Sequence, residues 1–320
     1  MHSIPSVGVV IPTRNRPDEL RLLLESLAKS TVVPTEIAIV ASGVDVKGVV
    51  NDFAGELHIK YLYSYEGGQV AQKSLAIAML SPELDWCLFT DDDLVVSPNA
   101  IFEALISVER MGHGQEIVGV GLALSPTSRL RQLPLVARSI AQLAGLDSGK
   151  RGKLLRSGHG VSYLDSDNDI FTDWLNGVSL WRMANALDYS KQVPNTPIAS
   201  CEDLVFSYSQ SKRGKMIFSM RASVSFQGDD QTNAEDYFVF TSSALWRLYL
   251  VHSDPYFSRI AFLWAQLFRT AFVFLVGPNR MTTTHRRYLS FYGYLSRLTF
   301  AQRINADWLE QNLESRWKSR

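Results

Sequence analysis

The chain has 320 residues, of which 46% are hydrophobic and 20% charged, with neither a repeat period nor a low-complexity tract. This is the composition of a globular protein, long enough for one large domain or two small ones, and it excludes a repeat architecture. The 32 basic residues balance the 32 acidic ones overall, but residues 255–320 hold ten Lys and Arg against three acids, a net charge of +7. The rest of the chain is acidic, which predicts an anionic partner for the basic tail.

The N-terminus, MHSIPSVGVV, has no basic stretch followed by a long apolar one, so no signal peptide is expected. The two cysteines, Cys87 and Cys201, have neither metal-ligand spacing nor the pattern of a disulfide framework. We therefore expect a cytoplasmic protein with two core cysteines.

Strand-like and helix-like segments alternate through the first half of the chain. The run VGVVIP is β-branched and ends in Pro, and the next segment has leucines at helical spacing after an initial Pro, Asp and Glu. The same patterns predict strands at 7–12, 36–41, 57–63, 86–90 and 117–123, and helices at 17–29, 70–80 and 99–110. This alternation predicts an α/β fold with a mostly parallel sheet covered by helices on both faces.

The second half is less regular. Residues 125–165 are rich in glycine and basic residues and predict a mobile lid or an acceptor loop. Regularity returns with WLNGVSLW (174–181), a helix over SCEDLVFSYSQSKRG and a strand at KMIFSM. We expect a catalytic domain over 1–230, with a nucleotide-binding half (1–124) and an acceptor half (125–230), followed by a C-terminal helical region (231–320).

The stretch FTDDDL places three consecutive acids, Asp91, Asp92 and Asp93, after a buried strand. Asp is a good turn residue, so a turn is the simplest explanation. In parallel sheets, however, ligands bind beyond the carboxyl ends of strands, where Thr13 and Ser42 are also expected. No glycine-rich phosphate loop of either common type is present. A Mg²⁺ or Mn²⁺ ion held by one or two carboxylates and substrate phosphates is the other common solution.

A second acidic cluster, Asp165, Asp167 and Asp169, begins like a calcium-binding loop. The turn glycine is replaced by Ile170, and Asn176 stands where the bidentate Glu belongs. A solvated acidic loop is therefore expected rather than a calcium site.

Taken together, these segments resemble a known family. VVIPTRNRPDELRLLLESL, AQKSLAIA, FTDDDL, LNGVSLWR and CEDLVFSYSQSKRG, in this order between about residues 7 and 226, are similar to the inverting family-2 glycosyltransferases of the GT-A (Rossmann-like) fold. The bacterial members that build cell-surface polysaccharides are the nearest comparison. The resemblance implies transfer of a sugar from a nucleoside-diphosphate sugar of UDP or dTDP type, assisted by a divalent metal, to a glycan or lipid-linked acceptor.

The resemblance also assigns roles to residues. It implies donor-nucleotide contacts for Asp91, Asp92 and Lys73, for Ser42, and for the first loop, Pro12, Thr13, Arg14 and Asn15. It implies metal binding by Asp93 with Asp91, and a catalytic base at Asp203. Three positions depart from the family pattern: Ser42 lies where an acid often contacts the base, Lys73-Ser74 replaces Arg-Asn, and Gln227 stands where a metal-binding His is common.

Other functions stay open for several of these residues. Ser200-Cys201-Glu202-Asp203 also fits a capping box at a helix start, in which case Glu202 becomes the alternative base. Trp174 fits either a core position or an acceptor contact, and Asn176-Gly177 fits an acceptor approaching the backbone closely. An inactive binding protein of the same fold and a nucleotidyltransferase are the alternatives for the whole chain. No nucleic-acid partner is expected.

The C-terminal stretch IAFLWAQLFRTAFVFLVG (260–277) is long and apolar, but Arg269 near its centre opposes a transmembrane helix. Either it packs on the catalytic domain or it lies on a bilayer surface. Five arginines, at positions 280, 286, 287, 297 and 303, are interleaved with Tyr288, Phe291, Tyr292 and Tyr294. Basic and aromatic residues favour an anionic membrane interface, so we expect peripheral association with the inner face of the cell membrane.

Overall fold

The computed structural model describes residues 4–65, 67–125, 135–162, 168–227, 237–276, 283–301 and 304–318. The chain divides into two compact units. The first, which we call the sheet unit, comprises Met1–Arg131, Tyr163–Ala199 and Asp203–Asp230; the second, the helical unit, comprises Gln132–Ser162, Ser200–Glu202 and Gln231–Arg320. Residues 132–162, which the sequence placed in the acceptor half, thus belong to the helical unit.

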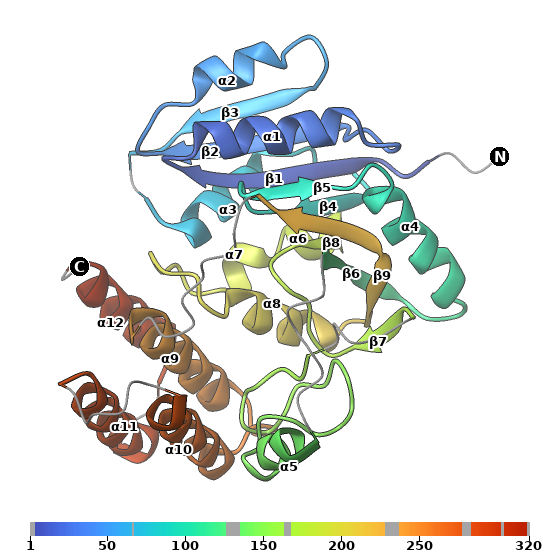
Figure 1. The fold of residues 1–320 in the computed structure, drawn as a ribbon. Helices are drawn as coiled ribbons and strands as arrows, with labels where there is room; N and C mark the ends of the chain where they lie inside the picture. The colour runs from blue at the N-terminus through green and yellow to red at the C-terminus, as the bar shows by residue number, and fades with distance from the viewer. Residues whose placement is uncertain are drawn as a thin grey trace. The chain divides into compact units, whose positions relative to one another are not determined.

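The described residues of the sheet unit form a nine-stranded sheet in the order β3-β2-β1-β4-β8-β6-β9-β5, with β7 paired to β9 (Figure 1). The strands β3, β2, β1 and β4 are parallel, whereas β8 runs antiparallel to both β4 and β6. Their bounds are β1 (Val7–Arg14), β2 (Glu36–Ser42), β3 (Ile59–Tyr63), β4 (Trp86–Phe89), β5 (Leu94–Val96), β6 (Ile117–Ser125), β7 (Ile170–Thr172), β8 (Ser179–Arg182) and β9 (Lys215–Phe226). The predicted α/β fold class is confirmed. The division into a nucleotide-binding half and an acceptor half stays a prediction.

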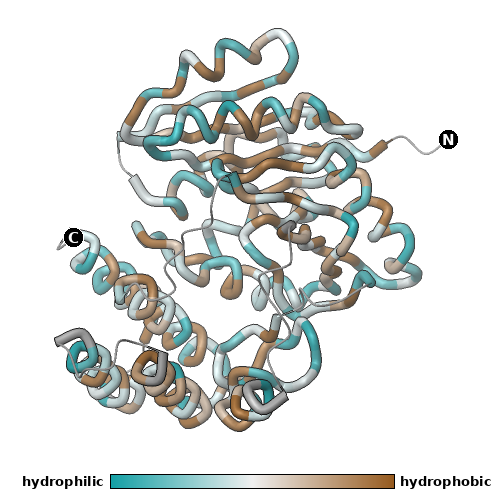
Figure 2. The backbone as a smooth tube through the Cα atoms, viewed as in Figure 1, coloured by the Kyte–Doolittle hydropathy of each residue, from teal (hydrophilic) through white to brown (hydrophobic). Residues whose placement is uncertain are grey.

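Helices cover both faces of this sheet because successive side chains of a strand point to opposite sides. Val7, Val9 and Ile11 of β1 share one core cluster with the leucines of α1 (Pro17–Ala28). On the other face, a Cβ atom at Gly8 would lie 2.8 Å from the side chain of Leu80, which follows α3 (Gln69–Met79). The remaining helices that begin in or belong to this unit are α2 (Lys47–Asp52), α4 (Ala100–Met111), α6 (Met183–Ala186), α7 (Tyr189–Gln192) and α8 (Glu202–Ser211). In Figure 2, the central strands are largely brown, and brown stretches also occur in the helices.

The start of β2 is fixed by the half-buried carboxylate of Glu36. Glu36 Oε2 accepts hydrogen bonds from Lys60 Nζ at 2.9 Å and from the backbone N–H of Ser81 at 2.8 Å. Burial alone would raise the pKa of Glu36, but the bonds from Ser81 and Lys60 outweigh it and lower the pKa below its ordinary value. The ionised form of Glu36 therefore ties β2, β3 and the end of α3 together.

The helical unit contains α5 (Leu135–Leu143), α9 (Tyr237–Ser253), α10 (Arg259–Val276), α11 (Thr283–Ala301) and α12 (Ala306–Lys318). Helices α10, α11 and α12 all contact α9. In the part of the chain that the structure describes, no helix is long and apolar enough to cross a membrane. Tyr288 and Phe291, which we expected at a membrane interface, are 1% and 4% exposed. They lie in an aromatic cluster with Phe240 of α9, because the apolar face of α11 packs against that helix. Cys87 and Cys201 are buried free thiols, as predicted.

Candidate active site

The acidic triplet lies just after β4, at the carboxyl end of that strand. The carboxyl end of the parallel strand β1 lies beside it. Phe89, the last residue of β4, pairs with Val10 of β1. The end of β1 in turn pairs with the end of β2, where Arg14 stands opposite Ser42. The parallel register therefore brings Thr13, Arg14, Ser42 and the three aspartates to one edge of the sheet, as the sequence predicted.

Asp92 points into the protein and anchors the triplet. Its carboxylate accepts hydrogen bonds from Thr13 Oγ1 at 2.8 Å and from Arg16 Nη1 at 2.9 Å, and the residue is 4% exposed. Burial raises the pKa of Asp92, and the bonds from Thr13 and Arg16 only partly offset this rise. Both carboxylate oxygens of Asp92 thus accept hydrogen bonds from the protein itself. A contact between Asp92 and the donor stays a prediction.

Asp93 and Asp91 lie on either side of this anchor and are more exposed. The same Arg16 Nη1 pairs with Asp93 Oδ2 at 2.8 Å. Asp91 Oδ1 accepts a hydrogen bond from Gln69 Nε2 at 2.8 Å, at the start of α3. A Cβ atom on Gly177 would lie 3.7 Å from Asp91 Oδ2, so the Asn176-Gly177 segment passes directly beside the triplet.

The first loop adopts a fixed and unusual conformation. Asn15 has a φ of 58°, and its side-chain oxygen accepts a hydrogen bond from the backbone N–H of Val44 at 2.9 Å. Gly43 has a φ of 76°, and a Cβ atom there would lie only 2.0 Å from Asn15 Oδ1. Only glycine fits this position, because it needs both a left-handed backbone and the missing side chain.

The nucleotide-binding prediction concerns the ends of β1 and β2. Gln72 Nε2 of α3 donates to the carbonyls of Thr13 and Val40, both at 2.8 Å, and so holds the two strand ends together. Ser42 Oγ is buried and makes no hydrogen bond to the described residues. Arg14 is exposed, whereas Pro12 is buried inside β1. The unsatisfied hydroxyl of Ser42 is therefore a polar group at this edge that a ligand could satisfy.

A small cavity of about 10 Å³, roughly the volume that one water needs, lies beside Gly177. Asn176, Gly177, Lys73 and Asp203 line it together with five other side chains: Phe89, Ser179, Trp181, Tyr189 and Phe206. Lys73 is 2% exposed, and its ammonium lies 5.5 Å from the ring centroid of Phe89 and 5.6 Å from that of Tyr189. The structure thus brings together the predicted base, Lys73 and part of the predicted acceptor segment.

Asp203 occupies the second position of α8. Its Oδ1 accepts a hydrogen bond from the backbone N–H of Leu204 at 2.7 Å. The carboxylate therefore satisfies one of the free amides of the first helical turn. Both functions stay open for the Asp203 side chain: a hydrogen-bond acceptor for the first turn of the helix, and a catalytic base. Glu202, the alternative base, begins the helix and is buried.

The acceptor residues have different surroundings. Asn176 Nδ2 donates to the carbonyl of Leu122 at 3.1 Å, while its Oδ1 is buried without a hydrogen bond among the described residues. Trp174 is half-buried and packs against Ala123 and Phe218. Contact between Trp174 and a sugar stays a prediction.

Gln227 is held by backbone carbonyls. Its Nε2 donates to Glu19 O and Leu94 O, both at 2.9 Å, and its backbone N–H donates to Asp93 O at 2.9 Å. Its Oε1 is buried and makes no hydrogen bond to the described residues. An oxygen ligand is therefore left beside the triplet, although the nitrogen side of the amide is committed to the fold.

The donor set was tested for its fit to a divalent cation. In the described parts of the chain, no group of three or more His, Cys, Asp and Glu side chains could by itself hold a metal ion. Mg²⁺ and Mn²⁺ sites of this kind need only one or two carboxylates, because substrate phosphates supply further oxygens. Asp91 and Asp93 provide these hard oxygen ligands, and the neighbouring Gln227 carbonyl is a third oxygen, so the residues fit a site completed by the substrate.

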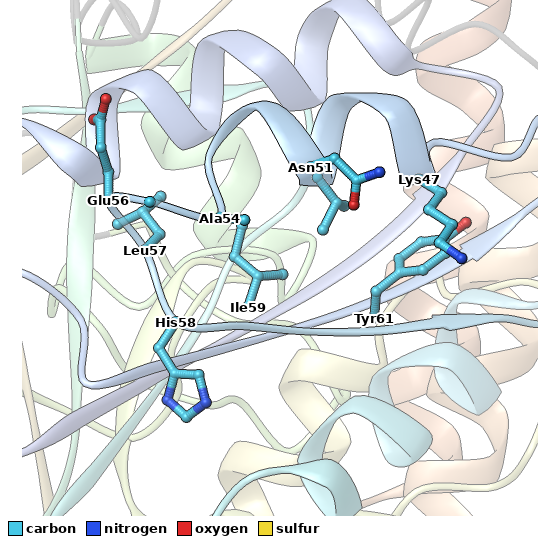
Figure 3. A pocket seen from close by; sticks show the side chains of 10 residues that line it. Lys47, Asn51, Ala54, Glu56, Leu57, His58, Ile59 and Tyr61 are labelled. Carbon is cyan, nitrogen blue, oxygen red and sulfur yellow. The ribbon is translucent and has the colours of Figure 1, made fainter.

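Two other features of the sheet unit lie away from this site. A pocket of about 530 Å³ runs between α2 and β3, where Asn51, Leu57 and Tyr61 line it (Figure 3). It is on the edge strand, and none of the aspartates lines it. Asp169 accepts hydrogen bonds from Ser107 Oγ at 2.6 Å and from the backbone N–H of Met220 at 2.9 Å and pairs with Arg110, so its carboxylate joins α4 to β9. For Asp169, the prediction of a solvated loop is therefore wrong. Asp165 and Asp167 lie outside the described residues.

Sequence reasoning missed Arg16, Gln69 and Gln72. Arg16 lies two residues after Arg14 in PTRNRP, and only the fold shows which of the two arginines reaches the acids. The two glutamines lie on the face of α3 toward the strand ends. Both glutamines lie in the first turns of the helix that follows the third strand, and this position in the sequence could have indicated that they reach the strand ends.

Comparison with known proteins places this geometry in a family. The model of the family described as "Glycosyl transferase family 2" matches residues 8–176, more than half of the chain. The chain therefore belongs to glycosyl transferase family 2. No curated protein sequence matches the chain significantly.

Solved structures share the fold across almost the whole chain. Staphylococcus aureus TarS 1–349 in complex with UDP-GlcNAc has a TM-score of 0.56 at 14% identity, covering 98% of this chain and 92% of that one. The mannosyltransferase PcManGT from Pyrobaculum calidifontis, in complex with GDP-Man and Mn²⁺, has a TM-score of 0.53 at 12% identity, covering 92% and 85%. At such identities the likeness shows the GT-A fold alone.

Proposed function

We propose that this family member transfers a sugar, with inversion, from a nucleoside-diphosphate sugar of UDP or dTDP type to a hydroxyl of a glycan or lipid-linked acceptor. The observation that carries the proposal is the position of Gly177. It lies beside Asp91 of the triplet and also lines the cavity that contains Asp203. A donor diphosphate at the triplet and an acceptor hydroxyl at Asp203 would meet there.

The donor end of the site is supported by chemistry and by analogy. The buried Ser42 hydroxyl and the exposed Arg14 offer a hydrogen bond and a positive charge at the ends of β2 and β1. TarS binds UDP-GlcNAc and UDP, and PcManGT binds GDP-Man, in structures of the same fold. These two observations favour a nucleotide-sugar donor, and the resemblance favours UDP or dTDP.

Asp91 and Asp93 would hold Mg²⁺ or Mn²⁺, and Gln227 Oε1 is a candidate further oxygen. When bound, such an ion supplies positive charge that neutralises a leaving diphosphate. Arg16 already pairs with Asp93, so it fixes this carboxylate and adds positive charge at the same point. Lys73 adds a second cationic group in the neighbouring cavity.

Asp203 is proposed to remove the proton from the acceptor hydroxyl, as a general base. Attack on the face of the anomeric carbon opposite the diphosphate inverts the configuration, and no covalent enzyme intermediate is needed. Asn176 and Gly177 would position the acceptor, and Trp174 would contact its sugar face. Hydrogen-bond donors and acceptors fixed before the reaction lower the barrier because they need no reorganisation.

A donor screen tests this function. The protein is incubated with a panel of nucleotide sugars and Mg²⁺ or Mn²⁺, and released phosphate species are identified by ion-exchange chromatography. Free nucleoside diphosphate is the expected product. In a parallel incubation with nucleoside triphosphates and sugar 1-phosphates, release of pyrophosphate would identify a nucleotidyltransferase instead. Binding of a donor without any turnover would identify an inactive binding protein.

A second proposal concerns location: the helical unit binds the cytoplasmic surface of an anionic membrane. Trp264 Nε1 of α10 donates to Leu143 O of α5 at 2.7 Å, so these two helices are adjacent. The exposed large apolar side chains of these two helices include Ile140, Leu143, Ile260, Trp264, Leu267 and Phe272. Exposed arginines at positions 259, 286, 287 and 297 supply positive charge in the same unit. Apolar surface with nearby basic charge is typical of in-plane membrane binding.

Flotation with phosphatidylglycerol vesicles tests this location. We expect the protein to float at low salt and to be released by high salt, and Trp264→Ser to weaken binding. Phe102→Ser is the matched control, because Phe102 is an exposed aromatic residue of the sheet unit. A protein that stays soluble at low salt, or that floats equally with neutral vesicles at high salt, contradicts the proposal.

A further inference from the structure

Two arginines of the helical unit converge on one serine. Arg247 Nη1 of α9 donates to the backbone carbonyl of Ser243 at 3.1 Å. Arg269 Nη2 of α10 donates to the hydroxyl of the same serine at 3.2 Å, and its Nη1 donates to Gln266 Oε1 at 3.1 Å. The Arg269 guanidinium also stacks 4.6 Å above the ring centroid of Phe240. Both residues are half-buried.

This pair has positive charge without a counter-charge. Within the described residues, neither arginine forms an ion pair with a carboxylate, and together they donate only the three hydrogen bonds just given. A guanidinium has five N–H donors, so most donors of the pair are unused by the protein. Arg247 Nε is buried and has no acceptor among these residues. Like charges at close range in a poorly solvated place are unfavourable, and the structure as described does not relieve this repulsion.

The groups around the pair are neutral hydrogen-bonding groups. Gln266 is fully buried, and its Nε2 lies 3.5 Å from His159 Nε2. Burial lowers the pKa of His159 well below its ordinary value, and the charges of Arg247 and Arg269 lower it further. Burial and the charge of Arg247 also lower the pKa of Arg269, to about 9. At neutral pH, His159 is therefore uncharged, and Arg269 keeps its charge.

We propose that Arg247 and Arg269 form a binding site for a phosphate group of a ligand. A phosphate monoester or inorganic phosphate carries between one and two negative charges at neutral pH, which suits two guanidinium groups. The planar guanidinium donates two parallel hydrogen bonds to phosphate oxygens, a geometry that suits the unused edges of these side chains. This site belongs to the helical unit and does not depend on the proposed transferase reaction, whose donor contacts lie in the sheet unit.

Calorimetric titration with inorganic phosphate tests the site, against chloride at equal ionic strength. We expect the wild type to bind phosphate, and Arg247→Gln and Arg269→Gln each to weaken this binding at least tenfold. Arg297→Gln is the matched control, because Arg297 is an exposed arginine of the same unit. Phosphate bound among the donor-binding residues would give a separate binding event that all three variants keep. A wild type that binds phosphate no better than chloride, or an equal loss in Arg297→Gln, overturns the proposal.

Thermal stability gives a second readout. The melting temperatures of Arg269→Gln and Arg297→Gln without phosphate are the two reference values, because Arg269→Gln also removes the contacts of Arg269 with Gln266, Ser243 and Phe240. Adding phosphate should stabilise the wild type and Arg297→Gln but not Arg269→Gln, since ligands stabilise the state that binds them. Phosphate that stabilises Arg269→Gln as much as it stabilises the wild type would overturn the proposal. Should Arg247→Gln not fold, the wild type and Arg269→Gln decide the question.

Discussion

Substituting Arg16 tests how the acidic triplet is held. Arg16 Nη1 bridges Asp92 Oδ1 at 2.9 Å and Asp93 Oδ2 at 2.8 Å, and Asp92 is almost fully buried. Arg16→Gln removes the positive charge and leaves Thr13 as the only hydrogen-bond donor described for the Asp92 side chain. Breaking a buried ion pair costs about 3–5 kcal/mol, and an exposed pair about 0–1 kcal/mol. Because the Arg16 side chain is 46% exposed, we expect an intermediate loss of about 1–2 kcal/mol.

Arg21→Gln is the matched control for this substitution. Arg21 pairs with Asp52 at 2.6 Å, but both side chains are well exposed, at 41% and 53%. We expect its loss to be about 0.5 kcal/mol or less. Both free energies of unfolding are measured by urea denaturation at neutral pH.

A double-mutant cycle isolates the Arg16–Asp92 pair. In Asp92→Asn there is no buried charge to compensate, so Arg16→Gln should cost less in that background than in the wild type. We expect a coupling energy of about 1 kcal/mol or more, as for residues in direct contact. Equal losses for Arg16→Gln and Arg21→Gln, or a coupling energy near zero, would refute the view that Arg16 anchors the triplet.

Three further substitutions give separate tests. Asp93→Ala should abolish metal-dependent transfer while the circular dichroism spectrum stays that of a folded protein; near-normal transfer at saturating donor and metal would remove Asp93 from the site. Gly43→Ala should lower the free energy of unfolding by about 2 kcal/mol, because the backbone is left-handed there and the added Cβ would meet the side chain of Asn15. Gly48→Ala in α2 should raise it by about 0.5–1 kcal/mol, because the added Cβ meets nothing and Ala favours the helix. Glu36→Gln should cost about 1 kcal/mol at pH 7. Because the pKa of Glu36 is lowered in the folded state, its stabilisation is fully present above the ordinary pKa of about 4.3 and is lost as the pH falls through the folded value. A difference in the free energy of unfolding between the wild type and Glu36→Gln that does not change with pH would contradict the assignment.

The long regular elements could be predicted from sequence because their patterns are local. The leucines of α1 and the β-branched runs of β1 and β2 gave bounds within two residues of those observed. The region 125–165 was expected to be irregular, yet it contains α5 between glycine-rich segments. Helix α2 and the strands β5 and β7 are too short to show a period, and the antiparallel direction of β8 depends on tertiary pairing.

For the candidate site, the sequence predicted which strand ends and loops contribute residues, but not how each side chain is oriented. A strand that ends in three acids within an alternating α/β pattern places Asp91 at the ligand edge of the sheet. Which carboxylate turns inward was not predictable, because the inward position of Asp92 depends on Thr13 and Arg16, about 79 and 76 residues earlier in the chain. The aromatic surroundings of Lys73 likewise come from Tyr189, a residue far away in sequence.

Asp203→Asn in a transfer assay tests the central proposal most directly. Asn keeps a side chain that can accept a hydrogen bond from the first turn of α8, so stability should change by about 1 kcal/mol or less. If Asp203 is the base, kcat should fall at least a hundredfold, in line with the usual contribution of general-base catalysis, while the Kd of the donor, measured separately by titration, stays unchanged. Turnover near that of the wild type, with donor binding intact, would show that the carboxylate only supports the helix and would contradict the proposed mechanism.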